Sequence, residues 1–243
     1  MREADLRQPM PSSLTESSAR SPEIVPEASG RVNLIGEHTA DDFGMNLSIS
    51  FDQQLLVELR DFRSGEIEIL PLGSPDKVIV IADTGVKNDR ADEELALRRE
   101  KCQDAAQALG VDSLRDASWM LLEMNRERLS DEVFRRARHV ITEIDRARNC
   151  FNRLRAGEWT AVASLLFASH ESLRDDYEIS CAELDELVKI ARSPDFDGLV
   201  YGSRMTGCGF GGATVSLVDE QIVDRFCETL SLNCKTLQTL PIR

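Results

Sequence analysis

"GRVNLIGEHTADDFGMN", residues 30–46, joins a strand-type run to a cluster of polar side chains. Gly36 separates the apolar run from Glu37 and His38, and Arg31 lies shortly before it. Taken singly, Arg31 indicates a surface ion pair, and Glu37 with His38 indicates a solvated turn. Taken together, a guanidinium, a carboxylate and an imidazole suit the recognition of hydroxyl groups and a phosphate.

Outward from this stretch, short strand-type runs bounded by Gly, Asp or Ser predict several strands. The runs are "RVNLIG" (31–36), "MNLSISF" (45–51), "QLLVELR" (54–60), "GEIEIL" (65–70), "GLVYGSRM" (198–205), "GATVSLV" (212–218) and "CKTLQTL" (234–240). The segment "RDFRSGE", 60–66, predicts a hairpin connection. "KVIVIAD", 77–83, is a nearly continuous β-branched run, which is typical of a strand covered on both faces.

Helical periodicity replaces the strand pattern after Asp89. In "DEVFRRARHVITEIDRAR", 131–148, apolar residues recur at 3.6 spacing and predict one buried stripe. "SCAELDELVKIA", 180–191, begins with a capping-box pattern, Ser180 and Glu183, and predicts a second helix. Strands, then helices, then strands again predict an α+β fold with helices packed on one face of an antiparallel sheet.

The charge balance narrows the class of partner. The chain has 29 basic and 43 acidic residues among 243, a net charge of −14. A field of this sign repels nucleic acid and anionic membrane surfaces, so neither is expected as a partner. The negative net charge does not exclude an anionic ligand, because local backbone N–H groups can bind one.

Cysteine and histidine usage argues against a zinc site. The six cysteines show no Cys-x-x-Cys pair, and the three histidines are far apart in the sequence. We expect reduced thiols. The first residues have no apolar core of signal-peptide length, and no run is long enough to span a bilayer, so the expected location is the cytoplasm.

Two further motifs have both a structural and a functional interpretation. Gly207, Gly209, Gly211 and Gly212 lie in "MTGCGFGGATVSLV", where dense glycine allows sharp turns and close backbone approach. Without other information this is a wide turn that binds nothing. "SHESLRDDYEIS", 169–180, is most simply a helix end with local ion pairs, and a paired-carboxylate metal site is the alternative.

Four stretches in order resemble one enzyme family. They are "GRVNLIGEHT" (30–39), "RREKCQDAAQALGVDSLRD" (98–116), "RRARHVITE" (135–143) with "SHESLRDDYEISCAELDELV" (169–188), and "YGSRMTGCGFGGATVSLV" (201–218). With these motifs the chain resembles the galactokinases, members of the GHMP small-molecule kinases, over most of its length from Gly30 to about Val218.

The resemblance implies a fold and a division of the chain. It implies a GHMP-kinase-like α+β fold with an incomplete N-terminal domain, similar to ribosomal protein S5 domain 2, and a ferredoxin-like C-terminal α/β sandwich. The expected parts are an irregular lead-in over 1–29, a remnant of the N-terminal domain over 30–71, and the C-terminal domain over 72–243.

The resemblance also implies roles for individual residues. The arginine matching Arg31 stabilises charge on the transferred phosphoryl group, and the residues matching Glu37 and His38 bind sugar hydroxyls. The family's next sugar-binding aspartate is Ala40 here, and Asp41 beside it is the expected substitute. The Gly-rich turn matching 207–212 lines the nucleotide phosphates, so ATP and Mg²⁺ are the cofactors that the family implies.

Two family motifs are missing. No Gly-Leu-Ser-Ser-Ser segment that would cradle ATP phosphates occurs in this sequence. The family's Met-Asp-Gln-Phe segment with the general-base aspartate is also missing, and Asp52 in "SFDQQ" is a poor substitute because it lies out of register. The block between the first strands and "KVIVIAD" has the form of an internal deletion.

These absences leave three interpretations open. The first is a galactokinase-like protein that phosphorylates galactose poorly or not at all. The second is an active sugar 1-kinase with an altered ATP site. The third is a non-enzymatic protein that binds a sugar or a partner, and exposed core left by a deletion predicts self-association as a homo-oligomer.

Overall fold

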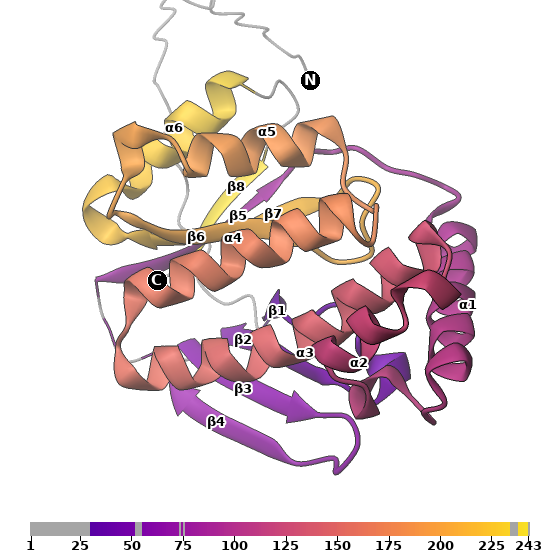
Figure 1. The fold of residues 1–243 in the computed structure, drawn as a ribbon. Helices are drawn as coiled ribbons and strands as arrows, with labels where there is room; N and C mark the ends of the chain where they lie inside the picture. The colour runs from indigo at the N-terminus through magenta and orange to yellow at the C-terminus, as the bar shows by residue number, and fades with distance from the viewer. Residues whose placement is uncertain (1–29, 52–54, 73, 75, 234–237, 243) are drawn as a thin grey trace, which may run out of the picture.

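The computed structural model describes residues 30–51, 55–72, 74, 76–233 and 238–242. Two antiparallel four-stranded sheets form the framework (Figure 1). The first sheet has the order β1-β2-β3-β4, with bounds Gly30–Ile35, Met45–Phe51, Leu55–Asp61 and Ile67–Pro71. The second has the order β6-β7-β5-β8, with bounds Val200–Thr206, Ala213–Asp219, Lys77–Asp83 and Gln238–Ile242.

Six α-helices accompany the sheets in the described part of the chain. They are α1 (Ala91–Leu109), α2 (Trp119–Met124), α3 (Asp131–Ala156), α4 (Trp159–Asp175), α5 (Ala182–Ala191) and α6 (Val223–Asn233). The α+β class and the antiparallel strands predicted from the sequence are confirmed. None of the described helices is long and apolar enough to cross a membrane.

The strand predictions agree with the structure wherever it describes the chain. The hairpin connection predicted over 60–66 joins β3 to β4. Of the last predicted strand, residues 234–237 and thus Cys234 lie outside the described residues, and β8 begins at Gln238. The lead-in predicted over 1–29 and Asp52 also lie outside the described residues. The boundary predicted at 71/72 stays a prediction, although the first sheet ends at Pro71.

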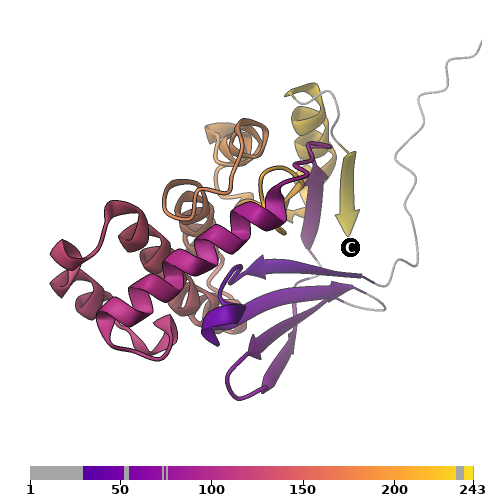
Figure 2. The same ribbon diagram turned by 90° about the vertical axis from the view of Figure 1, so that its right-hand side faces the viewer.

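Helix α3 buries its predicted apolar stripe partly against α1 and partly against the first sheet. Ala137, Val140 and Ala147 in this stripe have no exposed surface. The helix begins because the Ser130 side chain accepts a hydrogen bond from the N–H of Val133, and it continues well beyond the stripe that the sequence indicated. Figure 2 shows α1 running along the outer side of this layer.

The capping box predicted at the start of α5 is wrong. Cys181 is the residue that precedes the helix, and its side chain makes no capping hydrogen bond. The hydroxyl of Ser180 instead donates to the carboxylate of Asp185 at 2.5 Å. The sequence pattern misplaced the helix start because the serine is used in a side-chain pair rather than in a cap.

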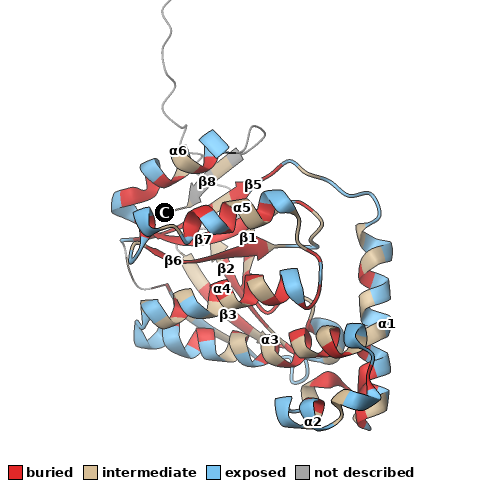
Figure 3. Ribbon diagram, turned by 45° about the horizontal axis from the view of Figure 1, so that its top comes forward, coloured by how far each residue is buried: buried red, intermediate tan, exposed pale blue. Residues whose placement is uncertain are grey.

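The second sheet is buried on both faces, as the "KVIVIAD" run predicted for β5. Val78 and Val80 pack in one core with α5 and α6, whereas Ile79 packs in another core with the first sheet and α3. Figure 3 shows the buried residues concentrated on the strands between the helices. The prediction of helices on a single face therefore applies to the first sheet and is wrong for the second.

The outer face of the first sheet carries polar side chains. Arg31 and Asn33 on β1 alternate with the buried Val32 and Leu34. The strands β2 and β3 continue this face, because β1 pairs with β2 and β2 with β3 in antiparallel register. The turn that follows β1 opens onto this polar face.

Candidate sugar-binding pocket

The turn after β1 requires glycine at position 36. Gly36 has a φ of +96°, and a Cβ there would lie 2.3 Å from the carbonyl oxygen of Met45. No other residue fits this conformation and this approach. The Gly36 N–H donates to Oε1 of Glu143 at 2.9 Å, which fixes the turn on α3.

A cavity of about 420 Å³ opens beside this turn. It brings together three of the residues that the sequence singled out, Arg31, Glu37 and His38. The lining residues are Arg31, Asn33, Gly36, Glu37, His38, Ala40, Asn46, Arg60 and Phe62. The predicted function of Gly36, to turn the strand end toward the same cleft as Arg31, is consistent with this geometry.

Arg31 reaches the cavity from the open face of the first sheet. Its Nε donates to the hydroxyl of Ser48 at 2.6 Å, and its Nη1 lies 3.8 Å from a carboxylate oxygen of Glu58. The side chain is 38% exposed. The guanidinium is thus oriented by one good hydrogen bond and keeps donors available to a ligand.

Glu37 is buried, and donors within the chain occupy much of its carboxylate. Its Oε1 accepts from the N–H of Gly207 at 2.7 Å and from the hydroxyl of Thr206 at 3.0 Å. Its Oε2 is paired with the fully buried guanidinium of Arg204. Since an ionised carboxylate has about four acceptor positions, little capacity is left for a ligand. The sugar contact expected of Glu37 stays a prediction.

His38 lies between the cavity and the core. Its ring stacks on Tyr177 with centroids 5.1 Å apart, and its buried Nε2 has no hydrogen-bond partner in the described structure. Burial lowers the pKa of His38 to about 4, and the positive charges of Arg204 and Arg99 add to this effect. The imidazole is therefore neutral near pH 7 and can exchange a hydrogen bond with a hydroxyl group.

Two buried residues of α3, Glu143 and His139, support the turn after β1. Their roles were not predicted from the sequence. Glu143 accepts from the Gly36 N–H, from the Ser169 hydroxyl at 2.6 Å, and from Nε of Arg146 at 2.6 Å. Burial opposes its ionisation, but the charges of Arg146 and other cations lower the pKa of Glu143 to about 2. His139 is fully buried, and burial lowers its pKa to about 3. The signal in the sequence for these two roles was the spacing of His139 and Glu143, two polar residues four positions apart beside the apolar stripe of α3.

Asp41 does not line the cavity. It is exposed and pairs with Nε of Arg99 at 2.7 Å, whereas its neighbour Ala40 lines the cavity. The substitute role predicted for Asp41 needs the carboxylate to leave this ion pair. It stays a prediction.

The glycines of the Gly-rich turn are needed for packing. A Cβ on Gly209 would lie 2.7 Å from the carbonyl oxygen of Ile179, and a Cβ on Gly211 would lie 2.3 Å from that of Val86. Both glycines have positive φ. These close approaches explain why the sequence is dense in glycine here.

Three backbone N–H groups of the same turn donate hydrogen bonds to acceptors within the chain. Gly207 donates to Glu37, Phe210 to Ile179 at 2.6 Å, and Gly212 to Val86 at 3.0 Å. Among the described hydrogen bonds, none uses the N–H groups of Cys208, Gly209 and Gly211, which could donate to an anion. The nucleotide contacts expected of Gly207, Gly209, Gly211 and Gly212 stay a prediction.

The local pairing predicted in the 169–180 segment is confirmed for Asp175 and wrong for Asp176, whose partner lies on α3. Asp175 accepts from Nε of Arg174 at 2.7 Å, which agrees with the simpler interpretation, and Asp176 is paired with Arg138. Within the described ranges, no group of three or more His, Cys, Asp or Glu side chains is placed to hold a metal ion.

The cysteines that the structure describes are free thiols, as expected. They are Cys102, Cys150, Cys181, Cys208 and Cys227. Burial raises the pKa of Cys102 and of Cys150 far above the ordinary range, so these two are packing residues.

Comparisons with known proteins agree with this fold and these motifs. The family "GHMP kinases C terminal" matches residues 150–236. The chain is 46% identical to a galactokinase of Bos taurus over 167 residues, which is 69% of this chain and 42% of that protein. It is 46% identical to the Homo sapiens galactokinase over 161 residues, which is 66% of this chain and 40% of that protein.

Solved structures show the same fold. A Lactococcus lactis galactokinase crystallised with galactose superposes with a TM-score of 0.78 at 19% identity, over 89% of this chain and 92% of that one. The L. major mevalonate kinase in complex with R-mevalonate gives a TM-score of 0.51 at 16% identity, over 78% and 49% of the two chains. The chain spans about two-fifths of the length of the curated galactokinases that it matches.

Proposed function

Because this chain is a homologue of galactokinases and carries the C-terminal domain of the GHMP kinases, we propose that it binds a galactose-class sugar in the cavity between Arg31 and His38. The observations that carry this proposal are the Arg31 donors left available in that cavity and the buried Nε2 of His38, a lining residue, which has no partner within the described structure. A buried polar atom without a partner costs free energy, and a sugar hydroxyl would satisfy it.

We further propose that phosphoryl transfer from ATP is slow. The sequence lacks the Ser-rich phosphate loop and the general-base segment of the family. Loss of a general base costs on the order of 10²–10⁴ in rate. Loss of the phosphate cradle also removes positioning and charge stabilisation, on which phosphoryl transfer depends. ATP and Mg²⁺ belong to the family reaction, and we assign no step of this chain to them.

Titration calorimetry with millimolar galactose tests the binding proposal. We expect heat of binding for the unchanged protein and its loss in His38→Ala. Lys189→Gln on α5 is the control, because this exposed side chain pairs with Glu186 and does not line the cavity. Binding that is absent, or that survives His38→Ala unchanged, contradicts the proposal.

A coupled assay of ADP release separates this proposal from an active sugar 1-kinase. We expect little or no galactose-dependent turnover. Rapid turnover that Arg31→Ala abolishes would favour the active kinase. Galactose binding without turnover agrees with a protein that uses a kinase fold for binding. The cytoplasmic location expected from the sequence stays a prediction.

A further inference from the structure

Arg60 is a guanidinium without a partner on the wall of the cavity. Within the described residues it makes no ion pair within 4 Å and no side-chain hydrogen bond. Arginines near it differ, because Arg63 is bound by both carboxylate oxygens of Asp116 and Arg115 by those of Asp61. An unpaired cation that faces a cavity is available to an anionic group of a ligand.

Strand register places Arg60 at the His38 end of the cavity. Arg60 on β3 pairs with Asn46 on β2, and a Cβ on Gly36 would lie 2.9 Å from the Cα of Asn46. Arg31 pairs with Ser50, four residues further along β2, which is about 13 Å at 3.3 Å per residue. The Arg31 side chain extends back along the sheet to Ser48 and Glu58, which are two residues from Asn46 and Arg60, so both arginines face the same cavity.

The residues that line the cavity include no free carboxylate to balance these cations. Glu37 is already neutralised by the buried Arg204. Glu58, on the same face of the sheet, lies beside Arg31 and accepts from the hydroxyl of Ser50 at 2.9 Å. The cavity wall is thus positive at the Arg60 end, in a protein whose net charge is −14. A neutral sugar has no anionic group with which the Arg60 guanidinium could form an ion pair.

We propose that Arg60 binds a negatively charged group at the His38 end of this cavity and so selects an acidic monosaccharide. The fitting ligand class is a hexose with a carboxylate in place of its hydroxymethyl group. The planar guanidinium forms two parallel hydrogen bonds to a carboxylate, and the Asn46 amide on the same wall is a further donor. This inference rests on the proposed function, because it assumes that the cavity binds a sugar.

Titration calorimetry with galactose and galacturonate tests the inference, because the two sugars differ only at the sixth carbon. We expect galacturonate to bind at least about tenfold more tightly than galactose, which corresponds to about 1.4 kcal/mol. In Arg60→Gln the two affinities become equal within about threefold. The charge-matched control Lys189→Gln keeps the tenfold difference, and added salt reduces it.

The outcomes separate this inference from the proposed function. If galactose binds and galacturonate binds no more tightly, or if the advantage persists in Arg60→Gln, the inference is wrong and the proposed function stands. If galacturonate binds through Arg60 and galactose does not bind, the inference stands and the sugar class of the proposed function is wrong. If neither sugar binds a protein with the circular dichroism spectrum of a folded chain, both are wrong.

Discussion

Glu37 and Arg204 form a buried ion pair that joins the turn after β1 to β6. Arg204 has no exposed surface and Glu37 is 5% exposed. The desolvation of two charges is costly, but removal of one partner alone leaves an uncompensated buried charge, which costs about 3–5 kcal/mol. The pair therefore holds the candidate pocket and the Gly-rich turn in one geometry.

Glu37→Gln tests the structural role of this pair. We expect the free energy of unfolding, measured by urea denaturation, to fall by about 3 kcal/mol because Arg204 loses its counter-charge. Asp41→Asn is the control, because it breaks the exposed ion pair with Arg99 and is expected to cost under about 1 kcal/mol. Equal losses in the two variants would contradict a buried pair at Glu37.

Stability should fall as the pH drops from about 6.5 to about 4. Burial lowers the pKa of His38 to about 4 and that of His139 to about 3, against an ordinary value of 6.5. The unfolded chain therefore takes up protons in this window that the folded chain does not, and each pKa unit corresponds to about 1.4 kcal/mol. The stabilising effect of Glu143, whose pKa is lowered to about 2, is lost only below about pH 4.5.

Urea denaturation at about pH 7.0, 5.5 and 4.5 measures this dependence. We expect the free energy of unfolding to decrease by at least about 2 kcal/mol from about pH 7.0 to about pH 4.5. His38→Asn should make the decrease smaller, because one of the two histidines no longer titrates. A free energy of unfolding that is constant over this range would show that neither histidine is buried in its neutral form.

At the scale of single residues, the sequence predicted that these side chains share a cleft, but it did not predict the partner of each side chain. The order of Arg31, Gly36, Glu37 and His38 along the chain was the signal for the cleft. The burial of Glu37 depends on Arg204, which lies 167 positions away in the sequence. Such long-range pairs leave no local pattern, so the role of Glu37 could not be derived from its neighbours.

At the scale of elements, β6 and α4 meet at a glycine. Gly202 has a φ of +115°, and a Cβ there would lie 2.7 Å from the side chain of Leu166 on α4 and 3.1 Å from the Cα of Ala163. This close approach brings the helix against the edge of the second sheet. A larger residue forces the helix and the strand apart.

Gly202→Ala should destabilise the protein by about 2–4 kcal/mol, because it combines a strained backbone with overpacking. Gly65→Ala is the matched control, since Gly65 also has positive φ but has nothing within 4 Å of its Cβ position. We expect the control to cost about 1 kcal/mol. Thermal unfolding monitored by circular dichroism measures both, and a control that costs as much as Gly202→Ala would refute the packing argument.

Periodicity predicted most elements because each pattern is local. The apolar stripe of α3 and the β-branched run of β5 could be recognised from neighbouring residues alone. The helix start at Cys181 was misplaced because Ser180 finds a partner in Asp185 instead of capping the helix. The run of β5 also predicted burial on both faces, but which elements cover each face depends on how distant segments stack, and no single segment encodes that.

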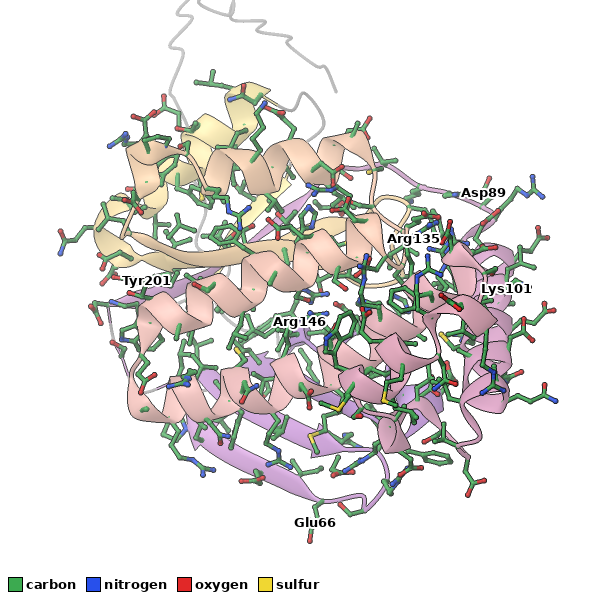
Figure 4. The ribbon with its side chains drawn as sticks, viewed as in Figure 1. Glu66, Asp89, Lys101, Arg135, Arg146 and Tyr201 are labelled. Carbon is green, nitrogen blue, oxygen red and sulfur yellow. The ribbon has the colours of Figure 1, made fainter. Side chains whose placement is uncertain are left out.

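At the scale of the whole molecule, the first sheet has one covered face and one open face. Figure 4 shows α3 and α4 crossing in front of the sheets, with Arg146 between the two helices and Glu66 at the far tip of the β3–β4 hairpin. On the edge strand β4, Ile67 is 44% exposed and Ile69 is 57% exposed. An exposed apolar edge strand favours pairing with another chain.

We predict self-association at high concentration through this edge. Light scattering at several concentrations should give a mass above the 27.2 kDa of one chain, rising with added salt because screening reduces repulsion between copies. Ile69→Lys should restore the monomer mass, whereas Leu97→Lys on α1, which replaces another exposed apolar side chain, should not. A single monomer mass at every concentration would contradict the prediction.

The proposed sugar-binding pocket is formed by the turn after β1 and the open face of the first sheet. A crystal structure of the protein grown with galactose tests it most directly. We expect sugar density in the cavity lined by Arg31 and His38, with a hydroxyl about 2.8–3.0 Å from a guanidinium nitrogen of Arg31. Galactose bound elsewhere on the protein, with this cavity free of sugar, would show that the turn after β1 is not the sugar site.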